Sequence, residues 1–416
     1  MAKNRRHKPR PGGPGMNKQQ RGKGGKNRKK GGKGAFVPKF QPGPDVVIAG
    51  TYAGVLEVNP KGYGFIRKLD FEFSYTPKDP FLKPDEVRHH DLRSGLILEG
   101  EFEEDKFGNR HVYSIDRINQ IPAEEWQKVN KFERQTPEMP TEHIQLGVNA
   151  EDLELRTIDL VAPIGKGQRA LIVAPPRTGK TVLLKKIAKN LVEHHPDVHV
   201  SVLLVDERPE EVTDFLRTTD AEVFASSNDK PTQSHIRIAE LALGYVKRKA
   251  EGGEHAVLLI DSLTRLGRAY NAAQTGSGRT LSGGLDIRAL EIPKKMFGAA
   301  RSFEGGGSLT IIATCLIETN SRMDDLIFEE FKGTGNMELV LDREIANERI
   351  FPAINILASG TRNEDKFIHD SLEERNMVRR YLLKKSPKES MLLLLQVLKN
   401  TDTNQEIFSQ LAATSA

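Results

Sequence analysis

The sequence is poor in cysteine, in aromatic residues and in long apolar runs. Its one cysteine, Cys315, cannot form an internal disulfide and supports no cysteine-based metal cluster, which fits a reducing cytoplasm. No run reaches the roughly 18 consecutive apolar residues that a membrane-spanning helix needs, and the N-terminus lacks the apolar core of a secretory signal peptide. These absences predict a cytoplasmic protein without membrane contact.

Acidic residues are absent from the first 40 residues, which contain 14 Lys and Arg and many glycines. A segment with so few apolar residues cannot bury enough surface to offset its ordering entropy, so residues 1–44 are predicted to form a disordered basic arm. Each Lys or Arg that neutralises a phosphate releases a counterion, which favours non-specific binding of a polyanion. A solubilising tail and an organellar transit peptide are the alternative interpretations.

The rest of the chain changes texture near residue 150. Residues 45–120 contain short strand-like runs bounded by turn residues, which predict a small β-barrel. Residues 121–150 are polar and punctuated by proline, a predicted connector with one short helix around Trp126. In residues 151–416, nearly continuous aliphatic strands alternate with helical patterns, which indicates a parallel sheet covered on both faces. The expected strands are 170–174, 200–205, 256–260 and 309–314, and the clearest helices are 182–193 and 234–249.

A phosphate-binding loop is predicted between the first of these strands and the helix that follows it. The segment is Ala174-Pro175-Pro176-Arg177-Thr178-Gly179-Lys180-Thr181, followed by Val182, and it matches the Walker A pattern except that Ala174 replaces the first glycine. Backbone N–H groups of such a loop cradle phosphates, Gly179 allows close approach, Lys180 reaches the β and γ phosphates, and the Thr181 hydroxyl binds Mg²⁺. The alternative is a chance Gly-Lys-Thr at a helix start.

Two carboxylates follow other predicted strands of the same region. Asp261 ends the strand 256–260, as a Walker B ligand of Mg²⁺ does, on what we expect to be a neighbouring strand. Glu207, just after the strand 200–205, is placed to orient and deprotonate an attacking water. The alternatives are a turn former for Asp261 and a surface ion pair with Arg208 for Glu207. Together with the loop, the two carboxylates predict a nucleotide hydrolase that uses ATP and Mg²⁺.

An RNA-binding motif is predicted in the barrel. The segment Lys61-Gly62-Tyr63-Gly64-Phe65-Ile66-Arg67 alternates so that Tyr63, Phe65 and Arg67 share one face of a strand, where bases can stack on the rings. Phe81 and Arg110 are expected to extend this platform. The alternative is that the aromatic residues fill the barrel core. An RRM fold is disfavoured because the segment lacks the two helices that this fold requires.

These motifs together resemble one family, the bacterial transcription termination factor Rho. The resemblance runs from about Gly50 to at least Asp365 and is carried by the two motifs above and by the segments 205–212, 260–265, 297–301, 330–339 and 359–362. In place of the small N-terminal helical subdomain of many members, this sequence has the basic arm.

The resemblance implies a RecA-like P-loop NTPase core preceded by an OB-fold barrel of the cold-shock type. It implies a homohexameric ring that loads single-stranded RNA on the barrels and threads it through a central channel. The implied activity is that of an RNA-dependent ATPase and 5′–3′ RNA(-DNA) helicase, which terminates transcription by moving along nascent RNA. The implied partners are the RNA polymerase elongation complex and elongation factors.

The resemblance also assigns roles to single residues. It implies that Lys180, Thr181 and Asp261 hold Mg·ATP, that Glu207 activates water and that Arg208 lies at the nucleotide pocket. It implies that Arg362 is an arginine finger for the adjacent subunit. The segments 276–284 and 320–325 resemble channel loops that contact RNA, through Arg279 and Arg322.

Three other protein classes remain as alternatives. A catalytic subunit of a rotary ATPase also joins a β-barrel to a P-loop core, but it needs a helical domain after the core, and only about 50 residues follow Arg362. A RecA-type recombinase acting on DNA is disfavoured by the aromatic motif of the barrel. A non-enzymatic RNA-binding regulator leaves Lys180, Glu207 and Asp261 unexplained.

Overall fold

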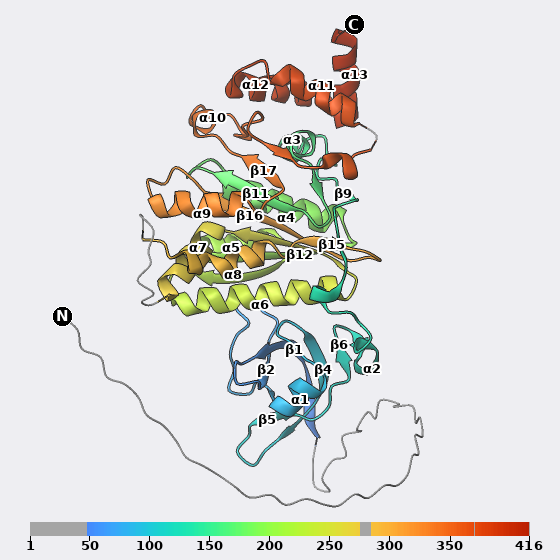
Figure 1. Ribbon diagram of the computed structural model, residues 1–416, viewed down its shortest axis with the longest axis vertical. Helices are drawn as coiled ribbons and strands as arrows, with labels where there is room; N and C mark the ends of the chain where they lie inside the picture. The colour runs from blue at the N-terminus through green and yellow to red at the C-terminus, as the bar shows by residue number, and fades with distance from the viewer. Residues whose placement is uncertain (1–47, 275–283, 370, 416) are drawn as a thin grey trace, which may run out of the picture. The chain divides into compact units, whose positions relative to one another are not determined.

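The computed structural model describes residues 48–274, 284–369 and 371–415 (Figure 1). The chain divides into residues 1–44 and residues 45–416, and only the second unit contains described residues. The predicted basic arm and Arg279 therefore lie outside the described residues.

A small barrel begins the described chain and confirms the prediction for this region. Its strand order is β1-β2-β3-β5-β4, and a second pairing between β1 and β4 closes the barrel, while β6 and β7 continue the sheet from β4. Along β4 (Ile97–Glu104), Leu98 and Phe102 point inward while the alternating glutamates point outward. The other elements are β1 (Ile48–Val58), β2 (Gly64–Arg67), β3 (Phe81–Leu82), α1 (Pro84–His89), β5 (Arg110–Val112), β6 (Arg117–Ile118) and β7 (Ile121–Pro122).

The connector joins the hydrophobic cores on its two sides. Trp126 lies on the short helix α2 (Ala123–Trp126), where a helix was expected, and it packs into the barrel core. Phe132, in a 3-10 turn (Phe132–Arg134), packs into a core of the region that follows. Two short strands, β8 (Pro137–Glu138) and β9 (His143–Ile144), complete the connector.

A nine-stranded sheet organises the remainder and confirms the predicted α/β class. Its order is β13-β12-β14-β16-β11-β17-β18, with the neighbours from β13 to β17 parallel and β18 antiparallel. The strand of the phosphate loop, β11 (Arg169–Ala174), is separated from β14 (His255–Asp261) by β16 (Ser308–Leu316), so Asp261 does not lie on the adjacent strand that we expected. The other strands of this order are β12 (Val198–Glu207), β13 (Glu222–Ser227), β17 (Met337–Val340) and β18 (Gly360–Thr361). The remaining two members of the sheet lie off this order, because β15 (Arg301–Phe303) pairs with β16 and with β8. A separate two-stranded sheet joins β10 (Ile164–Gly165) to β9.

Helices cover both faces of this sheet. Consecutive strand residues point to opposite sides, so a strand that is apolar throughout presents apolar side chains to both layers of helices. Ala170 and Ile172 of β11 join the core formed with α4 (Lys180–His194), whereas Leu171 and Val173 join the core formed with α6 (Thr232–Glu251). None of the described helices is both long and apolar enough to cross a bilayer. The other helices are α3 (Leu153–Val161), α5 (Pro209–Thr218), α7 (Leu263–Ala273), α8 (Glu291–Phe297), α9 (Arg322–Lys332), α10 (Arg343–Asn347), α11 (Leu372–Leu382), α12 (Pro387–Lys399) and α13 (Asn404–Ser415), and two 3-10 turns span Ile287–Leu290 and Glu364–Lys366.

A buried arginine on α3 forms hydrogen bonds to the C-terminal helices. Arg156 is 0% exposed, and its guanidinium donates to the carbonyls of Ala150, Leu398 and Thr401, to the Thr401 hydroxyl and to the Asn404 amide oxygen. Its acceptors are all neutral oxygens, so hydrogen bonding rather than an ion pair compensates the burial of this cation.

Candidate functional site

The loop between β11 and α4 has the backbone that a phosphate site requires. Gly179 caps the helix with φ of 91°, a conformation that L side chains rarely adopt, and Arg177 also has a positive φ of 67°. The Thr178 hydroxyl donates to the Pro175 carbonyl at 2.8 Å and braces the turn. The first N–H groups of a helix have no partner inside the helix, so the start of α4 presents donors and a positive dipole to an anion.

Lys180 and Thr181, the first two residues of α4, both lie close to the Asp261 carboxylate. The Lys180 ammonium forms an ion pair with Oδ1 of Asp261, and the Thr181 hydroxyl lies 3.4 Å from Oδ2. Asp261 is completely buried and also accepts a 2.8 Å hydrogen bond from the Thr314 hydroxyl on β16. The intervening strand thus supplies a donor that fixes the carboxylate facing the loop.

Glu207 reaches the same place from β12. Its Oε1 lies 3.9 Å from Lys180 Nζ and 3.2 Å from Nη2 of Arg265, while Oε2 is buried without a partner among the described residues. Burial, and secondarily the Asp261 carboxylate, raises the pKa of Glu207 to about 7, although Lys180 and Arg265 oppose the shift. A carboxyl group with this pKa can take up a proton near neutral pH.

A bulge positions Glu207. The β12–β13 register shifts between Val205 and Glu207, and Asp206 between them has φ of 57°. The Arg265 guanidinium donates to the Asp206 carbonyl and thereby spans the bulge and the Glu207 carboxylate. Arg265 belongs to the segment 260–265, but the sequence alone does not assign it a role, because nothing in it pairs Arg265 with residues almost 60 positions earlier.

The described residues fit a magnesium ion better than a metal held entirely by protein. No group of three or more His, Cys, Asp or Glu side chains in the described ranges is arranged to hold a metal. Mg²⁺ is instead bound through one or two oxygen ligands of the protein together with water and phosphate oxygens. The Thr181 hydroxyl and the Asp261 carboxylate, 3.4 Å apart, provide such a pair.

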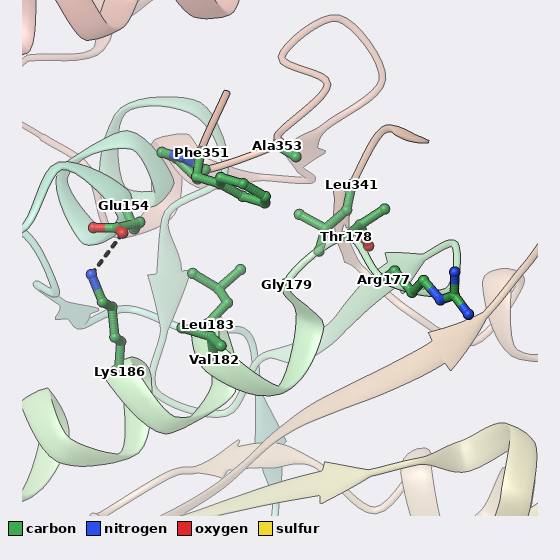
Figure 2. Close-up of a pocket in the computed structure, with 11 residues that line it drawn as sticks. Glu154, Arg177, Thr178, Gly179, Val182, Leu183, Lys186, Leu341, Phe351 and Ala353 are labelled. Carbon is green, nitrogen blue, oxygen red and sulfur yellow. Dashed lines mark hydrogen bonds and ion pairs between the residues drawn. The ribbon is translucent and has the colours of Figure 1, made fainter. Parts of the chain in front are cut away.

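A cavity of about 380 Å³ adjoins the loop and contains a residue that the sequence did not single out (Figure 2). The Phe351 ring points into it over Gly179 and Val182, while Arg177 extends away. Phe351 is 46% exposed, and the aliphatic side chains of Leu183 and Leu341 contribute to the wall around it. No sequence pattern links Phe351 to the loop, because the chain between them forms most of the sheet.

The other predicted nucleotide residues differ in their exposure. Val182 and Pro176 are exposed on the loop and the first turn of α4, whereas Pro175 is buried beneath it. Arg208 precedes α5 and is exposed. Arg362 follows β18 and is exposed, and its guanidinium makes no ion pair within the described parts of the chain. Arg362 is not among the residues that line the cavity beside the loop of its own chain.

In the barrel, an aromatic face forms from Tyr63, Phe65, Phe81 and His111. Phe65 and Phe81 pair across β2 and β3 with ring centroids 5.5 Å apart, and Tyr63 lies 5.6 Å from Phe81. His111 on β5 adds a ring 5.8 Å from Phe81, and sequence reasoning missed it. Because successive residues of a strand point to opposite faces, His111 was to be expected on the face opposite Arg110. The four rings are partly exposed and lie outside the barrel core.

The basic residues predicted beside these rings are placed differently from one another. Lys61 is exposed, but Arg67 is only 8% exposed and is held by Glu57 and Asp79, each at 2.6 Å. Arg110 is not brought to the aromatic face, because its guanidinium lies over Phe102 and pairs with Glu104 at 3.0 Å.

The two predicted channel residues belong to a different part of the chain. Arg322 begins α9 and is exposed. Arg279 lies outside the described residues.

Comparisons with known proteins match both halves of this arrangement. The RNA-binding domain of the Rho termination factor matches residues 52–125, and the nucleotide-binding domain of the ATP synthase alpha/beta family matches residues 154–361. The transcription termination factor Rho of Pseudomonas fluorescens biotype C is 47% identical over 85% of this chain and 86% of its own length. That of Thermotoga maritima is 46% identical over 85% and 83%.

A solved structure shares the fold at much lower identity. The assembled ATPase EscN from the type III secretion system of enteropathogenic E. coli superposes with a TM-score of 0.55 at 18% identity, covering 89% of this chain and 99% of its own. The identity with the curated relatives extends over most of the chain, and the two family matches cover the barrel and the nucleotide-binding region. The protein is therefore a member of the transcription termination factor Rho family, an RNA-binding ATPase.

Proposed function

We propose that this protein couples ATP hydrolysis to movement along single-stranded RNA and so acts as a 5′–3′ helicase that releases nascent transcripts from RNA polymerase. The observation that carries the proposal is one chain with two sites. Lys180, Asp261 and Glu207 converge on a phosphate loop, and the barrel exposes a face of stacked rings.

At the ATP site, each side chain has a separate task. The N–H groups of the loop and Lys180 bind the phosphates, and the Phe351 ring stacks on the base of the nucleotide. Glu207, with its pKa near 7, orients a water molecule and takes its proton as the water oxygen bonds to the terminal phosphorus. The bond from that phosphorus to the bridging oxygen breaks, and ADP leaves with this oxygen. Thr181 and Asp261 would hold Mg²⁺, which when bound neutralises charge on the phosphate oxygens.

Arg362 completes the site from a second copy of the chain. The residue is exposed and does not line the cavity beside the phosphate loop of its own chain, which supports its action across an interface. An arginine contributed in this way stabilises the charge of the transferring phosphoryl group. A closed ring of identical subunits would complete every site in this way, and we propose a hexamer in which Arg322 and Arg279 contact RNA.

One assay tests the central claim. Purified full-length protein is given ATP with no nucleic acid, with pyrimidine-rich RNA and with DNA, and phosphate release is measured. Strong stimulation by RNA alone is expected, with activity lost in Lys180→Ala and in Glu207→Gln. Equal turnover under all three conditions would favour a rotary-type ATPase and reject the proposal.

A second assay tests the shared site. Arg362→Ala and Lys180→Ala proteins should each be inactive alone, whereas mixed rings should contain some interfaces with both wild-type groups. Partial recovery of ATPase activity on mixing is expected. Absence of recovery at every ratio would show that Arg362 does not act across an interface.

A further inference from the structure

A row of stacked rings and guanidinium groups leads from the aromatic face to the ATPase region. Beyond Phe65, the Cζ atom of Arg67 lies 4.7 Å from the Phe65 centroid and 4.7 Å from the Tyr75 centroid. Cζ of Arg237, which belongs to α6, lies 4.2 Å from the same Tyr75 ring. The row of stacked groups therefore continues past the barrel and ends on a helix of the ATPase region, and Tyr75 is its exposed member.

Glu57 fixes the two guanidinium groups of this row. Its Oε2 accepts from Nε of Arg67 at 2.6 Å and from Nη2 of Arg237 at 2.8 Å, and its Oε1 accepts from Nε of Arg237 at 2.6 Å. Asp79 accepts a further bond from Arg67 at 2.6 Å. Two cations thus face two carboxylates, so the row offers oriented planar groups and little free positive charge.

Tyr75 remains 67% exposed and borders a cavity of about 440 Å³, within the range of about 300–1,000 Å³ that small-molecule sites occupy. The amide side chains of Asn59 and Gln233 contribute to its wall. Rings and guanidinium planes stack on any base, and amides hydrogen-bond to base edges. A phosphate would gain little here, because the carboxylates already neutralise the arginines.

We propose that Tyr75 and the adjoining cavity form an additional nucleobase subsite for single-stranded RNA, to which α6 contributes Arg237. The subsite rests on the proposed function in one respect, since it takes the RNA that the aromatic face binds. An occupied subsite brings one base into contact with the barrel and with the ATPase region at once. It also lengthens the RNA that full affinity requires.

The first test measures the affinity of the full chain for pyrimidine RNAs of increasing length. Tyr75→Ala is expected to bind a dinucleotide normally but to bind longer RNA about fivefold or more weakly, from the loss of one stacked base. Tyr75→Phe should retain wild-type affinity. Phe107→Ala is the matched control, because Phe107 is another exposed barrel ring, 77% exposed beside Lys106 and not part of the row.

The outcomes of this test separate the subsite from the aromatic face. The subsite is rejected if Tyr75→Ala binds every length like the wild type, or weakens short and long RNA by the same factor. Phe81→Ala should weaken all lengths. If instead it has no effect at any length, the proposed role of the aromatic face fails, whatever Tyr75 does.

The second test locates the base directly. RNA carrying 5-iodouridine at one position at a time is irradiated with the full-length protein, and the tryptic peptide 69–78, which contains Tyr75, is sequenced. We expect an adduct on Tyr75 from a nucleotide next to those that cross-link to the aromatic face, with a lower yield in Arg237→Lys. The proposal is overturned if no substituted position cross-links to Tyr75.

Discussion

The guanidinium of Arg265 bridges the backbone carbonyl of Asp206 and the carboxylate of Glu207, with Nη2 3.2 Å from Oε1 of Glu207. One side chain thus holds both the bulge of β12 and the proposed base at its end. Without it, the carboxylate would lose a partner and its orientation in a buried site.

Replacement of Arg265 by glutamine should therefore reduce kcat more than it changes the KM for ATP. Misplacement of a catalytic group by about 1 Å can cost roughly 100-fold, and we expect a loss of about ten- to hundredfold. Removal of the positive charge also raises the pKa of Glu207 further, so the acidic limb of the pH profile should move upward. Arg265→Lys, which keeps the charge, should shift that limb less. Unchanged kcat in Arg265→Gln would contradict the bridging role.

The pH dependence of the wild-type enzyme follows from the raised pKa of Glu207. A general base acts in its deprotonated form, so kcat/KM for ATP should rise with pH through about 7 and then level off. An ordinary exposed glutamate has a pKa of about 4.3, so it would give this rise in rate near pH 4 to 5 instead. RNA-saturated ATPase rates measured across this range would decide, and a profile that is flat from about pH 6 to 8 would exclude Glu207 as the titrating base.

Phe351→Ala should weaken nucleotide binding and leave the chemical step intact. Ring stacking contributes about 0.5–1.5 kcal/mol beyond area burial, so the Kd for ATP should rise about two- to tenfold with kcat nearly unchanged. Phe351→Tyr keeps the ring and should behave like the wild type. A fall in kcat with unchanged nucleotide affinity would place Phe351 outside the base pocket.

Arg156→Ala should destabilise the ATPase region without touching either site. The substitution removes a large buried side chain and leaves five oxygen acceptors without their donor, which we expect to cost about 3 kcal/mol or more. Chemical denaturation of the full chain measures it. Thr401→Val removes the hydroxyl, which accepts from Arg156 and donates to the Val397 carbonyl, and should cost about 1 kcal/mol. Similar losses in the two variants would argue against a central role for Arg156.

Deletion of residues 1–40 should weaken RNA binding at low salt and leave RNA-stimulated ATPase activity in place. Each lost phosphate contact reduces the slope of log K against log salt by about 0.7 for a single strand. Affinity measured over a series of salt concentrations tests this. An unchanged slope would rule out the arm as an RNA contact.

The sequence could predict those features that depend on neighbouring residues. The loop 174–181, the strands that precede Glu207 and Asp261 and the Phe65–Phe81 face all follow from local pattern and alternation. The sheet order could not be predicted, because strand neighbours depend on crossover connections, and β16 was not expected between β11 and β14. The burial of Arg67 was equally hidden, since its partners Glu57 and Asp79 are ten and twelve residues away and on other elements.

The contacts of Arg156 also constrain how the protein is made. Its acceptors at Leu398, Thr401 and Asn404 lie 242, 245 and 248 positions further along the chain. At about 5–20 residues per second, the ribosome needs roughly 12–50 s to synthesise that interval. Until then the Arg156 guanidinium lacks these acceptors and is better solvated by water than buried. The packing around α3 is therefore completed late, and the nascent ATPase region is exposed to chaperones or aggregation until then.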